Sequence, residues 1–187
     1  MATFEARWLT ETQLRVHIDT LHVRQWMLDK GSLTQRLIDH CEDEFAVRLR
    51  REEQGKPLRS ESLLLGLPAC RLAIIREVDL LCRGIPVVFA RTVIPFSSLR
   101  GRTRSLTGLG SRPLGAMLFQ DPTTRRDTVQ YARIRPGQGL YVSATQNLGQ
   151  CAGALMARRT LFCYKGRPLL VNEIFLPTLL ESGERIS

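Results

Sequence analysis

Apolar residues are concentrated in two stretches of this chain, and both predict β-hairpins. The first, residues 71–95, reads RLAIIREVDLLCRGIPVVFARTVIP, and the second, residues 156–177, ends in FCYKGRPLLVNEIFLP. In each, a basic residue and a glycine separate the two arms, and a two-residue turn that ends in glycine is a hairpin signal. A proline follows two residues after each glycine. We therefore expect two hairpins of one design within one antiparallel sheet.

Charged residues occupy equivalent positions in the two hairpins. If the glycine ends the turn, Arg76 faces Arg91 in the first hairpin, on a face that is otherwise apolar. Aligning the hairpins on their glycines matches these two arginines with Arg158 and Glu173. Like charges directly opposite are unfavourable, and burying them unpaired costs more. We therefore expect carboxylates of the protein or an anionic ligand to neutralise Arg76 and Arg91.

These four charged positions have two interpretations. Arg158 and Glu173 could form an ordinary cross-strand ion pair and nothing more. Alternatively, two arginines and a glutamate on apolar faces indicate a site for a small organic acid, because a guanidinium group binds a carboxylate through two parallel hydrogen bonds. Only three lysines occur among the 27 basic residues. This bias suits planar carboxylate recognition, although GC-rich coding produces it as well.

The N-terminal part of the chain predicts two helices and a turn. Apolar residues recur at helical spacing over residues 19–29, with Asp19 or Thr20 as the cap. Gly31 ends this helix, and the SLTQ that follows has the capping-box form, so a second helix is predicted over residues 33–41. The pair could read DNA, form a lid or simply pack on the core. Its second helix carries a single arginine, which argues against DNA reading.

The remaining pattern is less regular. The arginines in a Gly/Ser/Thr-rich connection that starts near Ser97 have no aromatic residue between them for base stacking, so we expect a solvated loop there rather than a nucleic-acid site. Elsewhere the pattern predicts a half-exposed strand over residues 44–50, a charged loop over 51–62, either helix or strand over 123–134, and a long loop over 135–150.

A helix start is predicted at the RPLG segment of residues 112–115, because proline is common in the first turn of a helix. The backbone N–H groups of Leu114 and Gly115 would then have no partner within the helix and would lie at its positive end, which suits an anion. The alternative is a plain helix start that packs on the sheet. A neighbouring arginine would favour the anion site.

Composition and charge limit the class of protein. The length of 187 residues, 43% of them hydrophobic, predicts one globular domain over residues 1–187. The net charge of +9 invites a nucleic acid or an anionic ligand, but the basic residues are scattered, and we expect no nucleic-acid partner. Five cysteines without a CxxC pair predict reduced, buried thiols, and the three histidines lack metal-ligand spacing. No signal peptide or membrane-spanning stretch is evident, which predicts a cytoplasmic location.

Four segments, in this order and spacing, carry a resemblance to a known family. They read DKGSLTQR, REVDLLCRGIPVVFARTVIP, RPLGAMLF and GRPLLVNEIFLP, and the chain from about residue 25 to residue 177 resembles the chorismate lyases of ubiquinone biosynthesis. The resemblance implies an α+β fold with a single antiparallel β-sheet and helices packed around it. It also implies conversion of chorismate to 4-hydroxybenzoate and pyruvate in a largely closed site, with no metal or other cofactor. We expect the protein to act as a monomer.

The same resemblance implies roles for individual residues. Arg76 would bind one substrate carboxylate together with the backbone around Leu114, and Arg91 would serve the second carboxylate. Glu173 would meet the 4-hydroxyl group, where it could accept a hydrogen bond or help to move a proton. Leu33 would belong to a lid over the ligand.

A second function is compatible with the same fold. The resemblance suggests that small-acid-sensing domains of transcription regulators share it, so the fold alone leaves the function open. A sensor would hold its ligand with the same arginines and leave it intact. Because this chain has no convincing DNA-binding segment beside the predicted sheet, the sequence favours the lyase.

Overall fold

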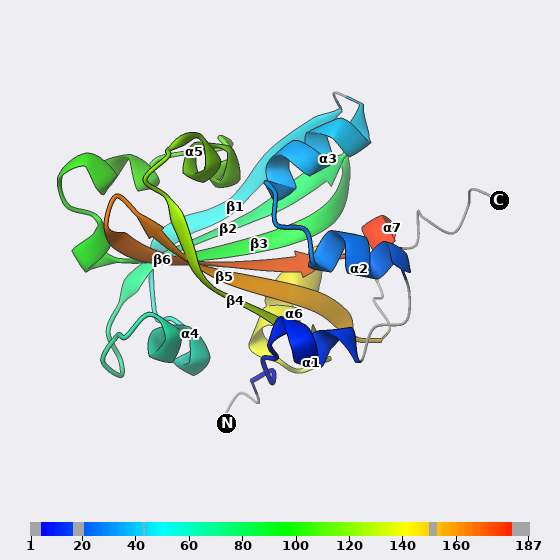
Figure 1. Ribbon diagram of the computed structural model, residues 1–187, viewed down its shortest axis with the longest axis horizontal. Coiled ribbons are helices and arrows are strands. Elements are labelled where there is room, and N and C mark those ends of the chain that lie inside the picture. The colour runs from blue at the N-terminus through cyan, green and yellow to red at the C-terminus, as the bar shows by residue number, and fades with distance from the viewer. Residues whose placement is uncertain (1–4, 17–20, 43, 150–152, 181–187) are drawn as a thin grey trace.

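A computed structural model shows one six-stranded antiparallel sheet with helices around it, which confirms the predicted fold class (Figure 1). The structure describes residues 5–16, 21–42, 44–149 and 153–180. None of the described helices has the length and apolar character needed to cross a membrane. The strands are β1 (Phe45–Gly55), β2 (Ala73–Cys82), β3 (Ile85–Pro95), β4 (Arg125–Ile134), β5 (Leu155–Tyr164) and β6 (Arg167–Phe175), in the spatial order β1-β2-β3-β6-β5-β4.

Short helices connect the strands and cover the sheet. Two of them, α2 and α3, lie close together in Figure 1, as the predicted helical pair requires. The helices are α1 (Glu11–Arg15), α2 (Leu21–Met27), α3 (Leu33–Cys41), α4 (Arg59–Leu64), α5 (Leu114–Gln120), α6 (Gly139–Thr145) and α7 (Pro177–Leu180), with short 3-10 helices η1 (Phe96–Ser98) and η2 (Gly101–Leu106).

Both predicted hairpins are present, and they lie side by side through the pairing of β3 with β6. Their turns are Arg83-Gly84 and Lys165-Gly166. All four turn residues have positive φ, at 52° and 77° in the first turn and 49° and 75° in the second. Two consecutive positive φ values are typical of a type I′ turn, whose twist matches that of the strands it joins.

The register of the first hairpin differs from the predicted one. Leu81 still pairs with Pro86, but Leu80 pairs with Val88, so β3 bulges by one residue. Beyond the bulge, Arg76 pairs with Thr92 rather than with Arg91. Since a shift of one residue moves side chains to the other face, the prediction that the two arginines share a face is wrong.

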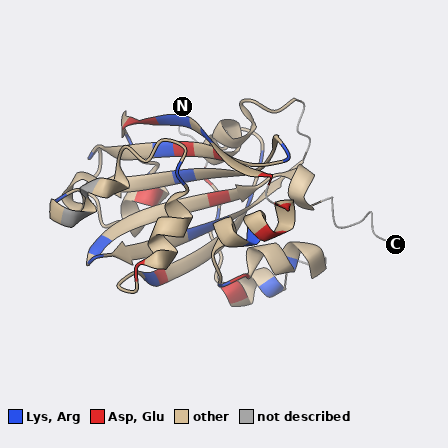
Figure 2. Ribbon diagram, turned by 90° about the horizontal axis from the view of Figure 1, so that it is seen from above, with Lys and Arg blue, Asp and Glu red and all other residues tan. Residues whose placement is uncertain are grey.

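The bulge gives the two faces of the sheet different chemistry. We call one the site face: along it, Val78, Ala90, Glu173 and Arg158 are neighbours on successive strands, with Arg76 one step away on β2. The other, the back face, has a corresponding row of Glu77, Arg91, Asn172 and Arg159. Acidic and basic residues are therefore interspersed within the sheet itself (Figure 2).

Different helices cover the two faces. On the site face, buried residues of α2 and α3 such as Trp26 and Leu37 pack against Val78, and α5 packs farther along the same face. On the back face, α6 buries Leu140 and Ala144. An apolar core under α6 thus covers part of the back face.

The predicted second helix of the N-terminal pair is confirmed as α3. Ser32 caps it, because its hydroxyl accepts a hydrogen bond from the backbone N–H of Gln35 at 3.3 Å. The side chain of Gln35 does not complete the capping box but donates to Asp39. The caps predicted for the first helix, Asp19 and Thr20, lie outside the described residues.

Three segments predicted as loops contain regular structure. The predicted charged loop over residues 51–62 holds the end of β1 and the start of α4, and the predicted long loop over 135–150 holds α6. The connection after Ser97 forms η1 and η2, and Leu106 is fully buried there. For α6 and η2, tertiary packing of a few apolar residues outweighs a polar or glycine-rich composition, whereas residues 51–62 are ordered by pairing with β2 and by the buried ion pair of Glu61 with Arg91. The ambiguous residues 123–134 form β4.

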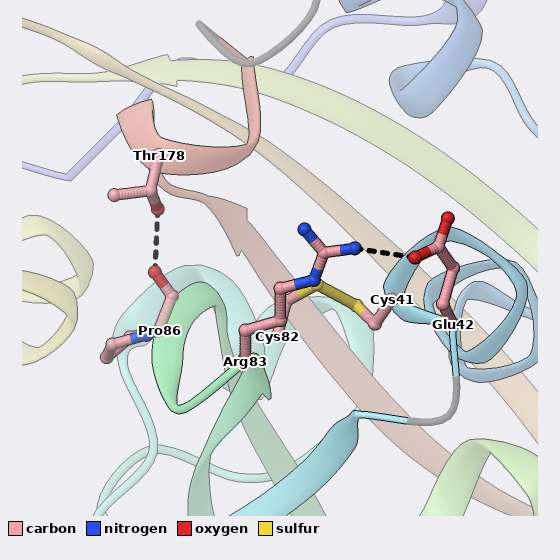
Figure 3. Close-up of a disulfide and its surroundings, with 6 residues drawn as sticks. All are labelled: Cys41, Glu42, Cys82, Arg83, Pro86 and Thr178. Carbon is pink, nitrogen blue, oxygen red and sulfur yellow. Dashed lines mark hydrogen bonds and ion pairs between the residues drawn. A yellow bond between two sulfur atoms is a disulfide. The ribbon is translucent and has the colours of Figure 1, made fainter.

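A disulfide joins Cys41, at the end of α3, to Cys82, at the end of β2 (Figure 3). Their Cα atoms lie 5.4 Å apart. An ion pair of 2.7 Å between Glu42 and Arg83, the residues that follow the two cysteines, lies beside the disulfide. The prediction that all cysteines are reduced is therefore wrong for this pair, which comes together only because α3 packs on the sheet. Cys70 and Cys163 are free.

Candidate functional site

A pocket lies between the site face and the helices α3 and α5. Its walls are mostly apolar with a few polar groups, as is common in small-molecule sites. Its free volume is only about 50 Å³, so a ring-sized ligand requires some lining side chains to move. Among the lining residues are Arg76, Val78, Ala90, Thr92, Val171 and Glu173 from the strands, and Leu33, Thr34, Leu114, Gly115 and Phe119 from the helices.

Arg76 is the buried cation of this pocket, with a side chain only 2% exposed. Its Nη2 donates to the carbonyl oxygens of Gly110 and Arg112 at 2.9 and 3.0 Å. Its Nε lies 3.4 Å from a carboxylate oxygen of Glu52 on the neighbouring strand. Burial lowers the pKa of Arg76, and Glu52 opposes that effect. The guanidinium is thus held rigidly by the segment that leads into α5.

The start of α5 forms the wall next to Arg76. The predicted helix start is confirmed, with Pro113 at the N-cap and Leu114 as the first helical residue. Gly115 approaches α3 so closely that a Cβ atom placed on it would lie 2.5 Å from Oγ1 of Thr34. The N–H groups of a first helical turn have no partner within the helix, and here no side chain of the described residues caps them.

The contact between Gly115 and Thr34 leads to a first prediction. We expect Gly115→Ala to destabilise the protein by about 1–3 kcal/mol, because the added methyl group overpacks the contact between α5 and α3. Urea unfolding followed by circular dichroism measures the change. Thr34→Ala removes Oγ1 and leaves the nearest Thr34 atom 3.5 Å away, so the double variant should regain most of the loss. Equal losses in the single and double variants would contradict this explanation.

Glu173 on β6 combines two of the roles considered from the sequence. Its Oε2 accepts a hydrogen bond from Arg158 Nε at 2.6 Å, which confirms the predicted cross-strand ion pair. It also lines the pocket. Burial by itself lowers the pKa of Arg158, but Glu173 outweighs this, and the net shift is upward. Glu173 therefore lies at the pocket wall as the ion-pair partner of Arg158.

Arg91 is the one predicted site residue that the structure does not bring to this pocket. On the back face, its Nε and Nη2 donate to Glu61 at 2.9 and 3.2 Å, and its Nη1 donates to Glu77 at 2.6 Å. Asn172 donates to the same Glu61 at 2.9 Å. Carboxylates of the protein thus neutralise Arg91, which was one of the two outcomes expected for the arginine pair. The bulge in β3 is the physical reason, because it turns Arg91 away from Arg76.

The sequence interpretation missed one arginine near the pocket. Arg126 on β4 lies over the rings of Phe119 and Phe162, at 4.7 and 5.6 Å from their centroids. Both rings line the pocket. Arg126 also donates to the carbonyl oxygens of Lys30 and Gly31, in the α2–α3 connection (residues 28–32). Only a strand over residues 123–134 places Arg126 there, and the sequence left that segment ambiguous.

Comparison with known proteins identifies relatives over nearly the whole chain. A family model described as chorismate lyase matches residues 2–185. A protein from Aromatoleum aromaticum named "Probable chorismate pyruvate-lyase" is 44% identical over 161 residues, which cover 85% of this chain and 86% of that protein. A protein of the same name from Azoarcus sp. is also 44% identical, over 84% of this chain and 85% of its own.

Solved structures with a similar fold are much more distant in sequence. The PhnF C-terminal domain has a TM-score of 0.55 at 13% identity, covering 70% of this chain and 82% of that domain. PhnF from Mycobacterium smegmatis has a TM-score of 0.53 at 12% identity, covering 81% of this chain and 66% of its own. At such identities the similarity establishes a shared fold and nothing about the ligand.

Proposed function

Because this chain belongs to the chorismate lyase family, we propose that it converts chorismate to 4-hydroxybenzoate and pyruvate, the first step of ubiquinone biosynthesis, without a metal or other cofactor. One observation carries the proposal for the site: a single mostly apolar pocket contains Arg76, Leu114, Gly115, Glu173 and Leu33. The resemblance implied Arg76, the backbone around Leu114, Glu173 and Leu33, and the predicted helix start implied Gly115, from four segments far apart in the chain. The proposal includes a monomeric, cytoplasmic enzyme.

Each residue has a role in this proposal. The ring carboxylate of chorismate binds Arg76 and the free N–H groups at the start of α5, at Leu114 and Gly115, which form two adjacent anion-binding features. Glu173 accepts a hydrogen bond from the 4-hydroxyl group. Leu33, directly after the capping Ser32, covers the ligand as part of a lid. The ring is thus held at its carboxylate and at the 4-hydroxyl group on the opposite side.

The reaction is an elimination that needs little covalent chemistry from the protein. The bond between ring C3 and the ether oxygen breaks, and its electron pair leaves with the enolpyruvate oxygen. The proton on C4 is lost, the new C3–C4 double bond completes the aromatic ring, and protonation of the enolate yields pyruvate. The protein's contribution is to orient the substrate and to stabilise the developing negative charge, and preorganised buried donors do this more strongly than water does.

The proposal is tested by turnover of chorismate. Purified protein mixed with chorismate should form 4-hydroxybenzoate and pyruvate in equal amounts, with no added metal or cofactor. We expect Glu173→Gln to reduce kcat/KM by about 10- to 100-fold, because it weakens a hydrogen bond to a charged group inside the pocket. Glu42→Gln is the matched control, since that side chain is 78% exposed.

Two results would count against a lyase. If chorismate bound and stayed intact, the chain would act as a small-acid-binding domain, which is the alternative that the sequence left open. If chorismate neither bound nor reacted, the assignment of the substrate would be wrong.

A further inference from the structure

The substrate of the proposed function carries two carboxylates, and the inference below rests on that function. Arg76 and the start of α5 account for the ring carboxylate. Arg91, the residue expected to bind the second one, lies on the back face with its guanidinium bound to Glu61 and Glu77. The enolpyruvyl carboxylate therefore needs a different cation on the site face.

Arg158 is the ion-pair partner of the pocket residue Glu173 and has one donor without a partner among the described residues. Its Nε binds Glu173 at 2.6 Å, and its Nη1 donates to the carbonyl oxygen of Asp29 at 2.7 Å. Its Nη2 is buried and has no hydrogen-bond partner among the described residues, while the side chain is only 2% exposed. Buried guanidinium N–H groups are normally satisfied, and an exception calls for an explanation such as a ligand.

Arg126 supplies a second cation beside the first. Its Nε is likewise buried without a hydrogen-bond partner in the described part of the chain. Its guanidinium lies over Phe119 and Phe162, which line the pocket. Burial lowers the pKa of Arg126, and the positive charge of Arg158 lowers it further, so the two guanidinium groups repel each other. An anion bound between them would relieve that repulsion and satisfy both free donors.

The chemistry of chorismate matches this arrangement. The enolpyruvyl group is attached to the ring carbon next to the one that carries the 4-hydroxyl group. A ligand whose 4-hydroxyl binds Glu173 therefore places the enolpyruvyl group beside Glu173, where Arg158 lies. We propose that Arg158, assisted by Arg126, binds the enolpyruvyl carboxylate of the substrate.

Under this proposal, Arg158 and Arg126 contact only one of the two products. After the carbon–oxygen bond breaks, Arg158 and Arg126 still contact the departing pyruvate, whereas 4-hydroxybenzoate touches neither. Both arginines also donate to carbonyl oxygens of the α2–α3 connection. The same side chains thus link the enolpyruvyl end of the site to the segment that leads into α3.

The test compares a ligand that has the second carboxylate with one that lacks it. Arg126→Gln should raise the KM for chorismate about tenfold or more, the loss expected for a charge-assisted hydrogen bond, and should leave the Kd for 4-hydroxybenzoate within about twofold. Arg158→Lys, which keeps the charge beside Glu173, should show the same selective loss, and Arg126→Lys should recover part of it. Arg159→Gln, the neighbouring arginine on the back face, is the control.

Each outcome decides between the possibilities. If the variants weakened the binding of chorismate and of 4-hydroxybenzoate equally, the two arginines would only stabilise the structure of the pocket. If neither the KM for chorismate nor the Kd for 4-hydroxybenzoate changed, the second carboxylate would bind elsewhere. Should Arg158→Lys fail to fold, Arg126→Gln decides alone. Failure of the wild-type protein to turn over chorismate would overturn the proposed function itself and is recognised before any variant is made.

Discussion

Arg91→Ala is expected to lower the free energy of unfolding by about 3–5 kcal/mol, the usual cost of removing one partner from a buried ion-pair network. Arg91 contacts Glu61 and Glu77, and the side chain of Glu61 is only 1% exposed. Without the guanidinium, the hydrogen bonds that Glu61 keeps in the described part of the chain come from neutral donors, Asn172 and the backbone N–H of Leu58, and Arg159 acts on it through its charge. A buried carboxylate that loses its hydrogen-bonded cation is very unfavourable.

Urea unfolding followed by circular dichroism measures this loss. Arg48→Ala is the matched control, because Arg48 is half-exposed and its partner Asp79 keeps a second ion pair with Arg50. We expect Arg48→Ala to lower the free energy of unfolding by about 1 kcal/mol or less. If Arg91→Ala were as stable as the control but lost affinity for chorismate, Arg91 would be a ligand-binding residue after all.

The same network predicts how stability depends on pH. Burial by itself would raise the pKa of Glu77, but hydrogen bonds from Arg51 and Arg91 hold it below its ordinary value of 4.5. A carboxyl group with a depressed pKa in the folded state stabilises the protein above pH 4.5, and this contribution is lost as the pH falls through the folded-state pKa. The wild-type protein should therefore lose stability below about pH 4.5 more steeply than Arg91→Ala, which retains only Arg51 at this position.

Arg76→Ala is expected to reduce kcat/KM for chorismate by roughly 30- to 900-fold, which corresponds to about 2–4 kcal/mol of lost transition-state stabilisation. Arg76 is buried and fixed by two carbonyl oxygens and Glu52, so its charge is preorganised toward the pocket. Steady-state kinetics on chorismate gives the ratio. Arg48→Ala serves again as the control, because it removes an arginine from the opposite face of the sheet.

Arg76→Ala should also weaken the binding of 4-hydroxybenzoate, because this product keeps the ring carboxylate. The two variants are thereby distinguished, because Arg126→Gln is expected to weaken the binding of chorismate and not that of 4-hydroxybenzoate. A kcat/KM within about threefold of wild type for Arg76→Ala would exclude Arg76 as the carboxylate-binding residue. Strong loss of chorismate turnover with unchanged binding of 4-hydroxybenzoate would instead exchange the roles proposed for the two ends of the pocket.

Local sequence signals predicted the elements that carry the site. The two turns that end in glycine predicted both hairpins, Ser32 predicted the start of α3, and Pro113 predicted the start of α5. These signals work from sequence because each depends on the backbone preferences of a few adjacent residues. The same patterns singled out Arg76 and Glu173 on the hairpins and Leu114 and Gly115 at the helix start, and the resemblance implied roles for them.

Features that depend on distant parts of the chain were not predictable in this way. The bulge in β3, which places Arg76 and Arg91 on different faces, has no turn residue to mark it. A register shift of one residue moves every side chain beyond it to the other face of the sheet. The pairing of Cys41 with Cys82 spans 41 residues and follows from the packing of α3 on the sheet. Arg126 lies beside the pocket residues Phe119 and Phe162 only because β4 joins the sheet through β5.

The sequence by itself determined the antiparallel hairpins, the capped helix beside them and the start of the helix at Leu114, since short-range conformational preference and alternation are written into neighbouring positions. The tertiary structure alone decided which face each charge occupies. It directs Arg91 into a buried carboxylate network and leaves Arg158 and Arg126 with donors that have no partner among the described residues. The physical reason is that burial and ion pairing depend on contacts between strands and helices far apart in the chain, which no local pattern encodes.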